Sequence, residues 1–336
     1  MIDGLSLSES ALEENVRAGL RQVEELLEES TDSPRGFVAE LVGHLSAAGG
    51  KRLRPVLTLV SASLGDEEAP LDWDVVRAAA VMELTHLASL YHDDVMDSAP
   101  TRRGVDSAQH LWGNNRAILA GDILFARASQ LIAQLGPEAV VYHAGVFERM
   151  CEGQLNESFG PTESDDPVQF YLQVLADKTG ALVAASAYLG ALSGGATPEQ
   201  ARIVEEFGER IGVAFQIADD VLDLTSPREL SGKTPGTDLR EGVDTLPVLL
   251  LRQHRAQGTL DEAGVQILQM LEGDLEDDLA LEQVVDALRE HPVLDETRAL
   301  AADWANDAVG VLEGLSDSDV KLGLLAFAAQ MTDRSV

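Results

Sequence analysis

The chain has 336 residues, 45% of them apolar and only 4% aromatic, and its 58 acidic against 24 basic residues give a net charge of −34. So acidic a surface repels nucleic acid and anionic lipid headgroups, which excludes general binding to phosphate backbones. The apolar fraction is sufficient for a folded core, and the low aromatic content favours helices over sheets.

The N-terminal part of the chain shows helical periodicity interrupted by Gly and Pro. Apolar residues recurring at helical spacing predict a first helix over residues 9–30 and a shorter one over 37–48. A turn over residues 49–55, containing two glycines, then leads into an apolar segment that ends near Gly65. After an acidic loop, a helix is predicted over 75–97, followed by a loop over 98–115 that is rich in Arg, Gly and Asn.

The remainder of the chain continues this pattern. Further helices are predicted over residues 117–135, 138–159, 168–192, 198–224 and 246–257. The segment 226–244 contains Gly, Pro and mixed charge, which predicts a long loop or lid. We find no convincing strand or hairpin pattern. One all-α domain over residues 1–336 is the simplest account, with a motif-bearing core at about 37–257 and an acidic helical part at 258–336.

The sequence contains few features that bear on cellular location. A single cysteine, Cys151, excludes an intrachain disulfide. The N-terminal residues lack the basic and apolar regions of a signal peptide, and no apolar stretch reaches the roughly 18 residues that cross a bilayer. We therefore expect a cytoplasmic protein without an integral membrane segment.

Two aspartate clusters share one spacing, Asp93-Asp94-Val95-Met96-Asp97 and Asp219-Asp220-Val221-Leu222-Asp223. The first and last aspartate of each lie one helical turn apart on the same face. Neighbouring carboxylates weaken a helix unless something neutralises them, and hard oxygen ligands in this arrangement suit Mg2+. Chance would give about 0.2 such patterns in so acidic a chain, so one cluster alone could be a solvated acidic face. A pair that each ends an apolar helix indicates carboxylates facing a cavity.

Each cluster shares its helical stripe with another polar residue. His86 lies about two turns before Asp93, and Gln216 lies about two turns before Asp223. A lone histidine on a helix is more often structural, but alignment with a metal cluster favours a functional role.

The few basic residues gather at particular places. Lys51, Arg52 and Arg54 follow the Gly-Gly turn, and Arg102-Arg103 follow the first aspartate cluster. Lys178 and Lys233 are more isolated. An Arg guanidinium can form bidentate hydrogen bonds to two phosphate oxygens, and Lys supplies a compact positive charge. These basic sites therefore suit two diphosphate groups. Each alone could instead be a solvated turn or a neutralising partner of the aspartates.

These motifs together resemble the trans-isoprenyl (polyprenyl) diphosphate synthases. The resemblance covers roughly residues 45 to 250 in the family's order and is highly specific. Its pieces are Gly-Gly-Lys-Arg-Leu-Arg-Pro (49–55), Leu-Tyr-His-Asp-Asp-Val-Met-Asp (90–97), Arg-Arg-Gly (102–104), Gly-Asn-Asn-Arg-Ala-Ile-Leu-Ala-Gly-Asp (113–122), Gly-Gln-Leu-Asn-Glu (153–157), Lys-Thr-Gly (178–180), Gly-Val-Ala-Phe-Gln-Ile-Ala-Asp-Asp-Val-Leu-Asp (212–223) and Gly-Lys-Thr-Pro-Gly-Thr-Asp (232–238).

The resemblance implies an all-α bundle around a deep central cavity, the isoprenoid synthase-type fold, as a homodimer. It implies binding of Mg2+, shared with the allylic diphosphate, by Asp93, Asp97, Asp219 and Asp223. It implies contact with the allylic substrate for Arg102, Lys178, Thr179, Gln216 and Lys233. It implies binding of isopentenyl diphosphate by Lys51, Arg54, His86 and Arg103. The catalytic residues would be Asp93, Asp97, Lys178, Asp219 and Lys233.

The implied reaction needs no side-chain nucleophile. Metal and basic residues stabilise the departing diphosphate, so the allylic C–O bond ionises to a cation. The double bond of isopentenyl diphosphate attacks this cation, and a proton is then lost, with the departing diphosphate as the expected acceptor.

Product length is expected to depend on residues one turn before the first aspartate cluster. Ala88 and Ser89 are small, which favours a product longer than farnesyl diphosphate, a medium-to-long polyprenyl diphosphate such as a quinone side-chain precursor. Met82 and Thr85 are candidate floor residues deeper along the same side. Small residues also let helices pack closely, which is the alternative explanation.

Three other functions remain open. A geranylgeranyl diphosphate synthase would share every motif. A terpene cyclase needs no second diphosphate, so Lys51, Arg54 and His86 argue against it. A non-catalytic partner subunit of a heteromeric synthase need not keep both aspartate clusters, and this chain keeps both.

Overall fold

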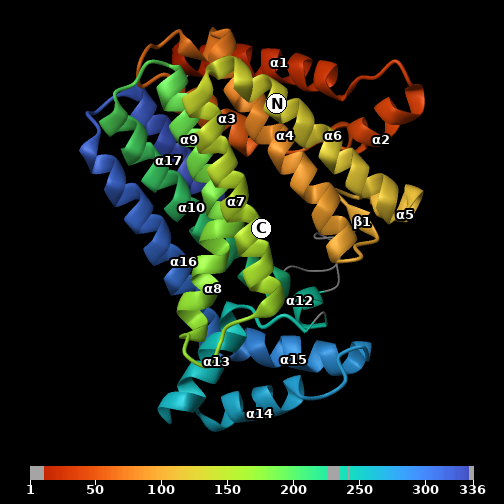
Figure 1. Ribbon diagram of the computed structural model, residues 1–336. Coiled ribbons are helices and arrows are strands. Elements are labelled where there is room, and N and C mark those ends of the chain that lie inside the picture. Colours follow the sequence, from red (N-terminus) through yellow and green to blue (C-terminus); the bar gives the residue numbers. More distant parts are fainter. Residues whose placement is uncertain (1–10, 226–234, 241, 333–336) are drawn as a thin grey trace. The chain divides into compact units, whose positions relative to one another are not determined.

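The structure is a computed structural model that describes residues 11–225, 235–240 and 242–332 (Figure 1). Its architecture is all-α, as predicted. In chain order the α-helices are α1 (Ala11–Thr31), α2 (Gly36–Ala47), α3 (Leu53–Ala62), α4 (Trp73–Met96), α5 (Ala108–Trp112), α6 (Asn114–Ile132), α7 (Pro137–Phe159), α8 (Pro167–Leu175), α9 (Ala181–Ser193), α10 (Pro198–Thr225), α12 (Thr237–Arg240), α13 (Leu246–Gln257), α14 (Glu262–Leu271), α15 (Asp278–Glu290), α16 (Pro292–Val311) and α17 (Asp319–Thr332). Shorter elements are the 3-10 turns η1 (Ala69–Leu71), η2 (Ala133–Leu135) and η4 (Leu312–Gly314), the π-helix η3 (Ala176–Gly180), and the strands β1 (Thr101–Arg102) and β2 (Val105–Asp106).

The chain divides into two compact units, which are described separately. Unit 1 comprises Met1–Glu148, Leu182–Gly208 and Val311–Phe327, and unit 2 comprises Arg149–Ala181, Glu209–Gly310 and Ala328–Val336. The expectation of a single domain over the whole chain stays a prediction.

Helix α4 is the central element of unit 1. It packs most extensively against α6 and also contacts α1 and α3. Its side chains from Val75 to Ala88 are buried on almost every side, whereas Met96 and Asp97 at its C-terminal end are exposed. The Tyr91 hydroxyl donates a hydrogen bond of 2.6 Å to the Leu41 carbonyl, which ties α4 to α2. The aspartate cluster therefore lies where a buried helix emerges from its packing, as the sequence predicted.

A small hairpin corrects the prediction that the chain contains no strands. Strands β1 and β2 pair antiparallel, with Thr101 opposite Asp106 and Arg102 opposite Val105. Arg103 and Gly104 form the turn with positive φ angles of 53° and 78°, the conformation that tight two-residue hairpins require. Strands of two residues are too short to show an alternating pattern, which explains why sequence periodicity missed them.

Unit 2 has its own apolar core. Buried side chains from α8, the second part of α10, and α12 to α16 form one cluster. Its members include Leu172, Ile217, Leu239, Leu246, Val284, Leu288 and Leu294. The acidic C-terminal part thus contributes helices to a core, although most of its charge is solvated. Helix α12 lies within residues 226–244, where a loop was predicted, and buries Leu239.

The predicted helix over residues 168–192 is interrupted. The structure has α8, then the five-residue π-helix η3, then α9. Segments of π-helix are rare and frequently occur at functional sites, and η3 contains Lys178 and Thr179. Polar residues 177–179 interrupt the apolar run here, but such an interruption does not by itself distinguish a π-helix from an α-helix.

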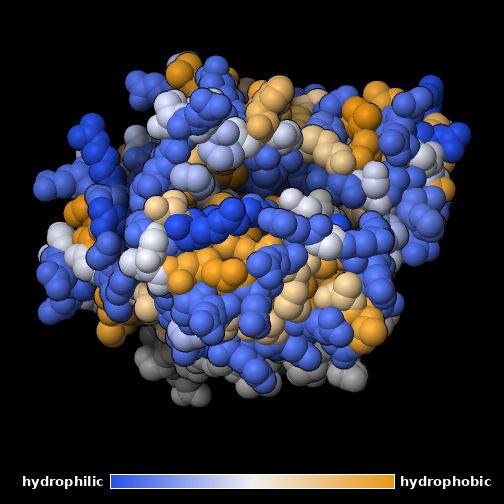
Figure 2. Space-filling view, turned by 90° about the horizontal axis from the view of Figure 1, so that it is seen from below, coloured by the Kyte–Doolittle hydropathy of each residue, from blue (hydrophilic) through white to orange (hydrophobic). Residues whose placement is uncertain are grey.

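Hydrophilic residues cover most of the face shown in Figure 2, with smaller hydrophobic patches among them. One described helical segment, Asn114–Leu135, is nevertheless long and apolar enough to cross a membrane by length and composition, with a mean hydropathy of 1.2. The expectation that no segment reaches this threshold was therefore wrong. Core and interface helices meet the same criteria, so the segment by itself assigns no membrane location.

Candidate active site

The turn before α3 adopts a conformation that gathers basic side chains. Gly49, Gly50 and Arg52 all have positive φ angles, of 89°, 155° and 50°. A Cβ atom on Gly50 would lie 3.0 Å from Nη1 of Arg103, so a larger residue there would displace this guanidinium from the backbone. Arg103 Nη1 donates hydrogen bonds to the carbonyls of Leu45 (3.0 Å) and Gly49. Arg103 thus organises the turn that precedes Arg52 and Arg54.

Three arginines surround a single buried carboxylate, Glu83 of α4. Glu83 Oε1 lies 2.9 Å from Arg52 Nη1 and 3.8 Å from Arg103 Nη2. Burial lowers the pKa of Arg54 to about 10, and Glu83 opposes this shift. Nε of Arg54 is buried and has no hydrogen-bond partner among the described residues. An unpaired donor in a cationic cluster is suited to an anionic ligand.

His86 lies one helical turn after Glu83 in the same region. Burial, followed by the charges of Arg54 and Arg103, holds the pKa of His86 well below its usual value. The imidazole is therefore neutral at pH 7 and can contribute hydrogen bonds but no charge. The residues predicted to bind isopentenyl diphosphate, namely Lys51, Arg54, His86 and Arg103, all belong to unit 1. Lys51 is exposed and the other three are partly buried.

The aspartates of the first cluster differ sharply in burial. Asp94 is fully buried, and its Oδ1 accepts a hydrogen bond of 2.6 Å from Arg102 Nε. Burial raises the pKa of Asp94, although Arg102 opposes the shift. Its other oxygen, Oδ2, has no hydrogen-bond partner in the described part of the chain. Asp93 is partly buried and Asp97 is exposed at the C-terminal cap of α4.

The second cluster repeats this arrangement within unit 2. Asp220 is buried, and its Oδ2 accepts hydrogen bonds from the Tyr171 hydroxyl (2.8 Å) and from the backbone N–H of Leu246 (3.3 Å). Burial raises the pKa of Asp220 well above its usual range. Asp219 is exposed and Asp223 is partly buried. In both clusters the second aspartate is bound by the protein, whereas the outer two are more accessible.

The π-helix η3 is held from several sides in unit 2. Arg149 Nε lies 2.5 Å from Asp177 and Arg149 Nη1 lies 2.5 Å from Glu209. These two carboxylates raise the pKa of Arg149 against the opposing effect of burial, so it stays charged. Lys178 Nζ lies 2.6 Å from Glu157, within the Gly-Gln-Leu-Asn-Glu motif. Gly153 allows α7 to approach η3, because a Cβ there would lie 2.8 Å from the Lys178 backbone nitrogen.

The remaining predicted residues have less specific surroundings. Gln216 and Thr179 are partly buried, and both belong to unit 2. Lys233 lies outside the described residues. No group of three or more His, Cys, Asp or Glu side chains forms a metal site among the residues that the structure describes. The oxygen-only chemistry of both clusters, whose outer aspartates are more accessible than the buried ones, nevertheless fits a hydrated divalent cation.

The predicted chain-length residues fall into two groups. Met82, Thr85 and Ala88 are fully buried. Thr85 Oγ1 lies 2.9 Å from Nε2 of His143, and the Ala88 carbonyl lies at the close contact of α4 with α6. Ser89 is partly exposed, and its hydroxyl donates to the His86 carbonyl at 2.8 Å. Of the four residues, Ser89 is therefore the most accessible.

Sequence reasoning missed several residues that hold these groups in place. Glu83 could have been noticed, because an acid inside the otherwise apolar part of α4 requires a partner. Tyr171 and Arg149 belong to helices distant in sequence from the groups they bind, so no local pattern identifies them.

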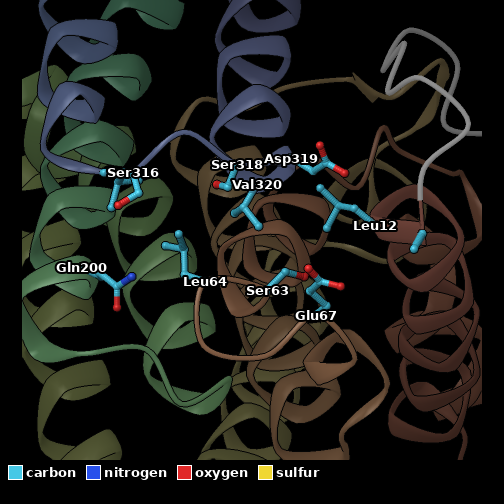
Figure 3. A pocket seen from close by; sticks show the side chains of 11 residues that line it. Leu12, Ser63, Leu64, Glu67, Gln200, Ser316, Ser318, Asp319 and Val320 are labelled. Carbon is cyan, nitrogen blue, oxygen red and sulfur yellow. The ribbon is translucent and has the colours of Figure 1, made fainter.

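A cavity of about 410 Å³ in unit 1 contains none of the predicted site residues (Figure 3). Its lining includes the carboxylates of Glu67 and Asp319 and no basic side chain. That charge does not suit a diphosphate, so we do not assign the cavity to the candidate active site.

Comparison with known proteins gives concordant matches. The family model described as Polyprenyl synthetase matches residues 36–288. The chain is 40% identical to nonaprenyl diphosphate synthase of Mycobacterium tuberculosis, over 99% of this chain and 98% of that protein. It is 36% identical to heptaprenyl diphosphate synthase component 2 of Geobacillus stearothermophilus, over 91% and 92%. Geranylgeranyl pyrophosphate synthase from Corynebacterium glutamicum, solved with calcium and isoprenyl diphosphate, is similar with a TM-score of 0.84, 40% identity and coverage of 97% and 98%.

Proposed function

The chain belongs to the polyprenyl synthetase family and is a trans-prenyltransferase, and we propose that it acts without a partner protein to condense an allylic diphosphate with isopentenyl diphosphate. Its product is a medium-to-long polyprenyl diphosphate. Two relatives that are each 40% identical are named for different products, nonaprenyl and geranylgeranyl diphosphate, so identity alone does not transfer an exact length. The water-soluble substrate isopentenyl diphosphate fits a cytoplasmic location.

The observation that carries this proposal is the arginine cluster of unit 1. Arg52, Arg54 and Arg103 gather around one buried carboxylate in a chain whose net charge is −34. Concentrating like charges costs free energy that an anionic ligand would offset. We assign isopentenyl diphosphate to this cluster, with contacts from Lys51, Arg54, His86 and Arg103.

The allylic diphosphate is assigned to the aspartate clusters and the basic residues near them. We assign divalent metal to Asp93 and Asp97 in unit 1 and to Asp219 and Asp223 in unit 2, and propose Mg2+ as the ion because all of these ligands are oxygens. The metal would neutralise and polarise the diphosphate leaving group. The residues that we assign to direct contact with the allylic substrate are Arg102, Lys178, Thr179, Gln216 and Lys233.

The protein residues then stabilise a leaving group rather than supply a nucleophile. Lys178 is a compact cation on the π-helix and is suited to negative charge that develops as the C–O bond breaks. Neutral His86 orients the second diphosphate without adding charge or donating a proton in the reaction. The deprotonation that ends each cycle is assigned to the released diphosphate, since no described carboxylate is needed for it.

The test is an assay of the purified chain alone. It would receive isopentenyl diphosphate, Mg2+ and allylic primers of increasing length, and mass spectrometry would identify each product. We expect elongation to one dominant product longer than farnesyl diphosphate. A dominant geranylgeranyl product would select the shorter-chain alternative, and the absence of elongation with every primer would contradict autonomous catalysis.

One relative supports a second candidate, a subunit that needs a partner. The Geobacillus protein is named component 2 of its synthase, and this chain covers 92% of its length. The retention of both aspartate clusters favours a catalytic role in either case. Activity that appears only after addition of a second protein would support the subunit function.

We also propose that the chain is a homodimer. Helices α5, α6 and α7 of unit 1 expose large apolar side chains, namely Leu111, Ile118, Leu119, Val140 and Val141. Only 28% of the most apolar window of the α6 segment is buried within the chain. A second copy covering this face would explain an apolar helix in so acidic a protein.

A further inference from the structure

Glu83 is a buried acid with an unusual environment. Its side chain is 3% exposed, and from Val75 to His92 helix α4 carries only one other formally charged residue, Arg77. A carboxylate in such a position costs several kcal/mol unless it is paired and hydrogen-bonded. Its retention in the middle of a buried helix therefore needs an explanation beyond helix packing.

The contacts of Glu83 join three segments of unit 1. Oε1 accepts a hydrogen bond of 2.9 Å from Arg52 in the Gly-Gly turn, and it lies 3.8 Å from Arg103 in the hairpin turn. Both arginines have left-handed backbone conformations, with φ angles of 50° and 53°. The Glu83 charge also acts on Arg54 at the start of α3. One carboxylate thus lies where three cationic segments meet.

Arg52 and Arg103 also have other partners, but none of these is a buried carboxylate. Arg52 also binds Glu24, with Nε to Oε1 at 2.7 Å, but the Glu24 side chain is 40% exposed. Arg103 otherwise donates to backbone carbonyls, which carry no net charge. Among the residues that the structure describes, Glu83 is the anion that acts on all three arginines of the cluster.

We propose that Glu83, paired with Arg52, is a positioning residue that holds Arg54 and Arg103 in place to receive the diphosphate of isopentenyl diphosphate. This inference rests on the proposed function. Without the carboxylate the three guanidinium groups repel one another, and their long side chains move apart. With it, the guanidinium charges are partly balanced, and the buried Nε of Arg54, which has no hydrogen-bond partner among the described residues, remains available to an anion.

The change in diphosphate binding when the Glu83 charge is removed distinguishes a positioning role from simple charge balance. If Glu83 acted only through its negative charge, removing that charge would strengthen diphosphate binding. If it positions the arginines, removing the charge weakens binding in spite of the more positive site. A merely structural role would lower stability and would affect both substrates equally.

The experiment compares three variants of the full chain. Glu83→Gln keeps the shape but removes the charge, and Glu83→Asp keeps the charge but shortens the reach. Glu24→Gln is the matched control, because it removes the exposed partner of Arg52 and leaves Glu83 in place. Calorimetric titration with isopentenyl diphosphate alone would give its Kd, and steady-state kinetics would give KM for each substrate. Circular dichroism and thermal unfolding would monitor the fold.

We expect Glu83→Gln to raise the Kd and KM for isopentenyl diphosphate at least tenfold, while KM for the allylic primer stays within twofold. Glu83→Asp should lie between this variant and the wild type, and Glu24→Gln should stay within about twofold of the wild type. If Glu83→Gln fails to fold, the Asp variant alone decides.

Two results would overturn the inference. One is unchanged or tighter binding of isopentenyl diphosphate in folded Glu83→Gln, or in Glu83→Asp where Glu83→Gln does not fold, and the other is an equal rise in KM for both substrates. If the wild-type chain neither binds nor elongates isopentenyl diphosphate, the proposed function fails and this inference fails with it. Wild-type activity combined with unaffected variants contradicts the inference alone.

Discussion

In each aspartate cluster the second carboxylate is buried and bound by another side chain, Arg102 for Asp94 and Tyr171 for Asp220. The outer aspartates are more exposed. Aspartates of the same motif therefore have different physical roles. The buried members orient the end of each helix, and the accessible members are the candidates for metal binding. We therefore expect a substitution at an outer aspartate to lower activity, and one at the neighbouring buried aspartate to lower stability.

Replacing Asp93 by Ala should lower kcat by about 10³-fold or more, since it removes an assigned metal ligand. The helical fold should stay intact, as measured by circular dichroism. Asp94→Ala should instead lower the free energy of unfolding by about 1–3 kcal/mol, because Arg102 loses its buried acceptor. Activity assays and denaturant titrations measure both effects.

Asp303→Ala, at an exposed aspartate of α16, is the control and should change neither quantity. An active Asp93→Ala enzyme would contradict the assigned role of the first cluster. Unchanged stability of the Asp94→Ala variant would contradict the stabilising role of the buried aspartate.

Of Ala88 and Ser89, Ser89 is the better position for testing the control of product length. Ser89→Phe should shorten the dominant product, because a bulky ring on the more accessible side of α4 would block a growing chain. Ala88→Phe should do so too, but its site is fully buried near α6, so a loss of about 1–3 kcal/mol in stability is expected as well. Chromatography of the products from one primer would measure this. An unchanged distribution in a stable Ser89→Phe variant would support close helix packing as the reason for the small residue.

At the scale of elements, the sequence predicted most helices because Pro and Gly mark their ends. Helices α4 and α7 begin and end within about two residues of the predicted bounds. The predicted start of the first helix, at residue 9, lies outside the described residues. The two-residue strands were not predictable, since they are too short to show an alternating pattern. The π-helix η3 was not predicted, because polar residues within a helix do not distinguish a π-helix from an α-helix. The aspartate clusters and basic turn were identifiable as motifs. Glu83 and Tyr171 were not, because their roles depend on contacts between distant segments.

The approach of α7 to η3 makes Gly153 a test of element positioning. Gly153→Ala would place a Cβ 2.8 Å from the Lys178 backbone nitrogen and 3.0 Å from Asp177 Cβ. The π-helix must shift, so we expect kcat to fall about tenfold or more and stability to fall by about 1–3 kcal/mol. Kinetics with varied allylic primer and thermal unfolding are the measurements.

Gly145→Ala is the matched control on the same helix. No atom lies within 4 Å of the position of its Cβ, so the substitution should stabilise the chain by roughly 0.5–1 kcal/mol through helix propensity. If Gly153→Ala behaved like Gly145→Ala, the position of η3 would not depend on this contact.

At the scale of the whole molecule, strong acidity and an exposed apolar helix require a common explanation. A net charge of −34 opposes non-specific association of copies, so a stable contact between them must be specific and apolar. The exposed side chains of α6 supply such a face, whereas a single exposed leucine elsewhere would not. The same charge makes the local arginine cluster more conspicuous as a site for anions.

The proposed dimer gives the test at this scale. Leu119 on α6 and Leu322 on α17 are similarly exposed, at 59% and 62%, and both belong to unit 1. Leu119→Glu should convert the dimer to monomer, because an unpaired carboxylate buried in an apolar interface costs several kcal/mol. Leu322→Glu should leave the dimer intact. Sedimentation velocity at several concentrations measures the outcome. A monomeric wild type, or equal effects of both substitutions, would show that the apolar face of α6 has another occupant.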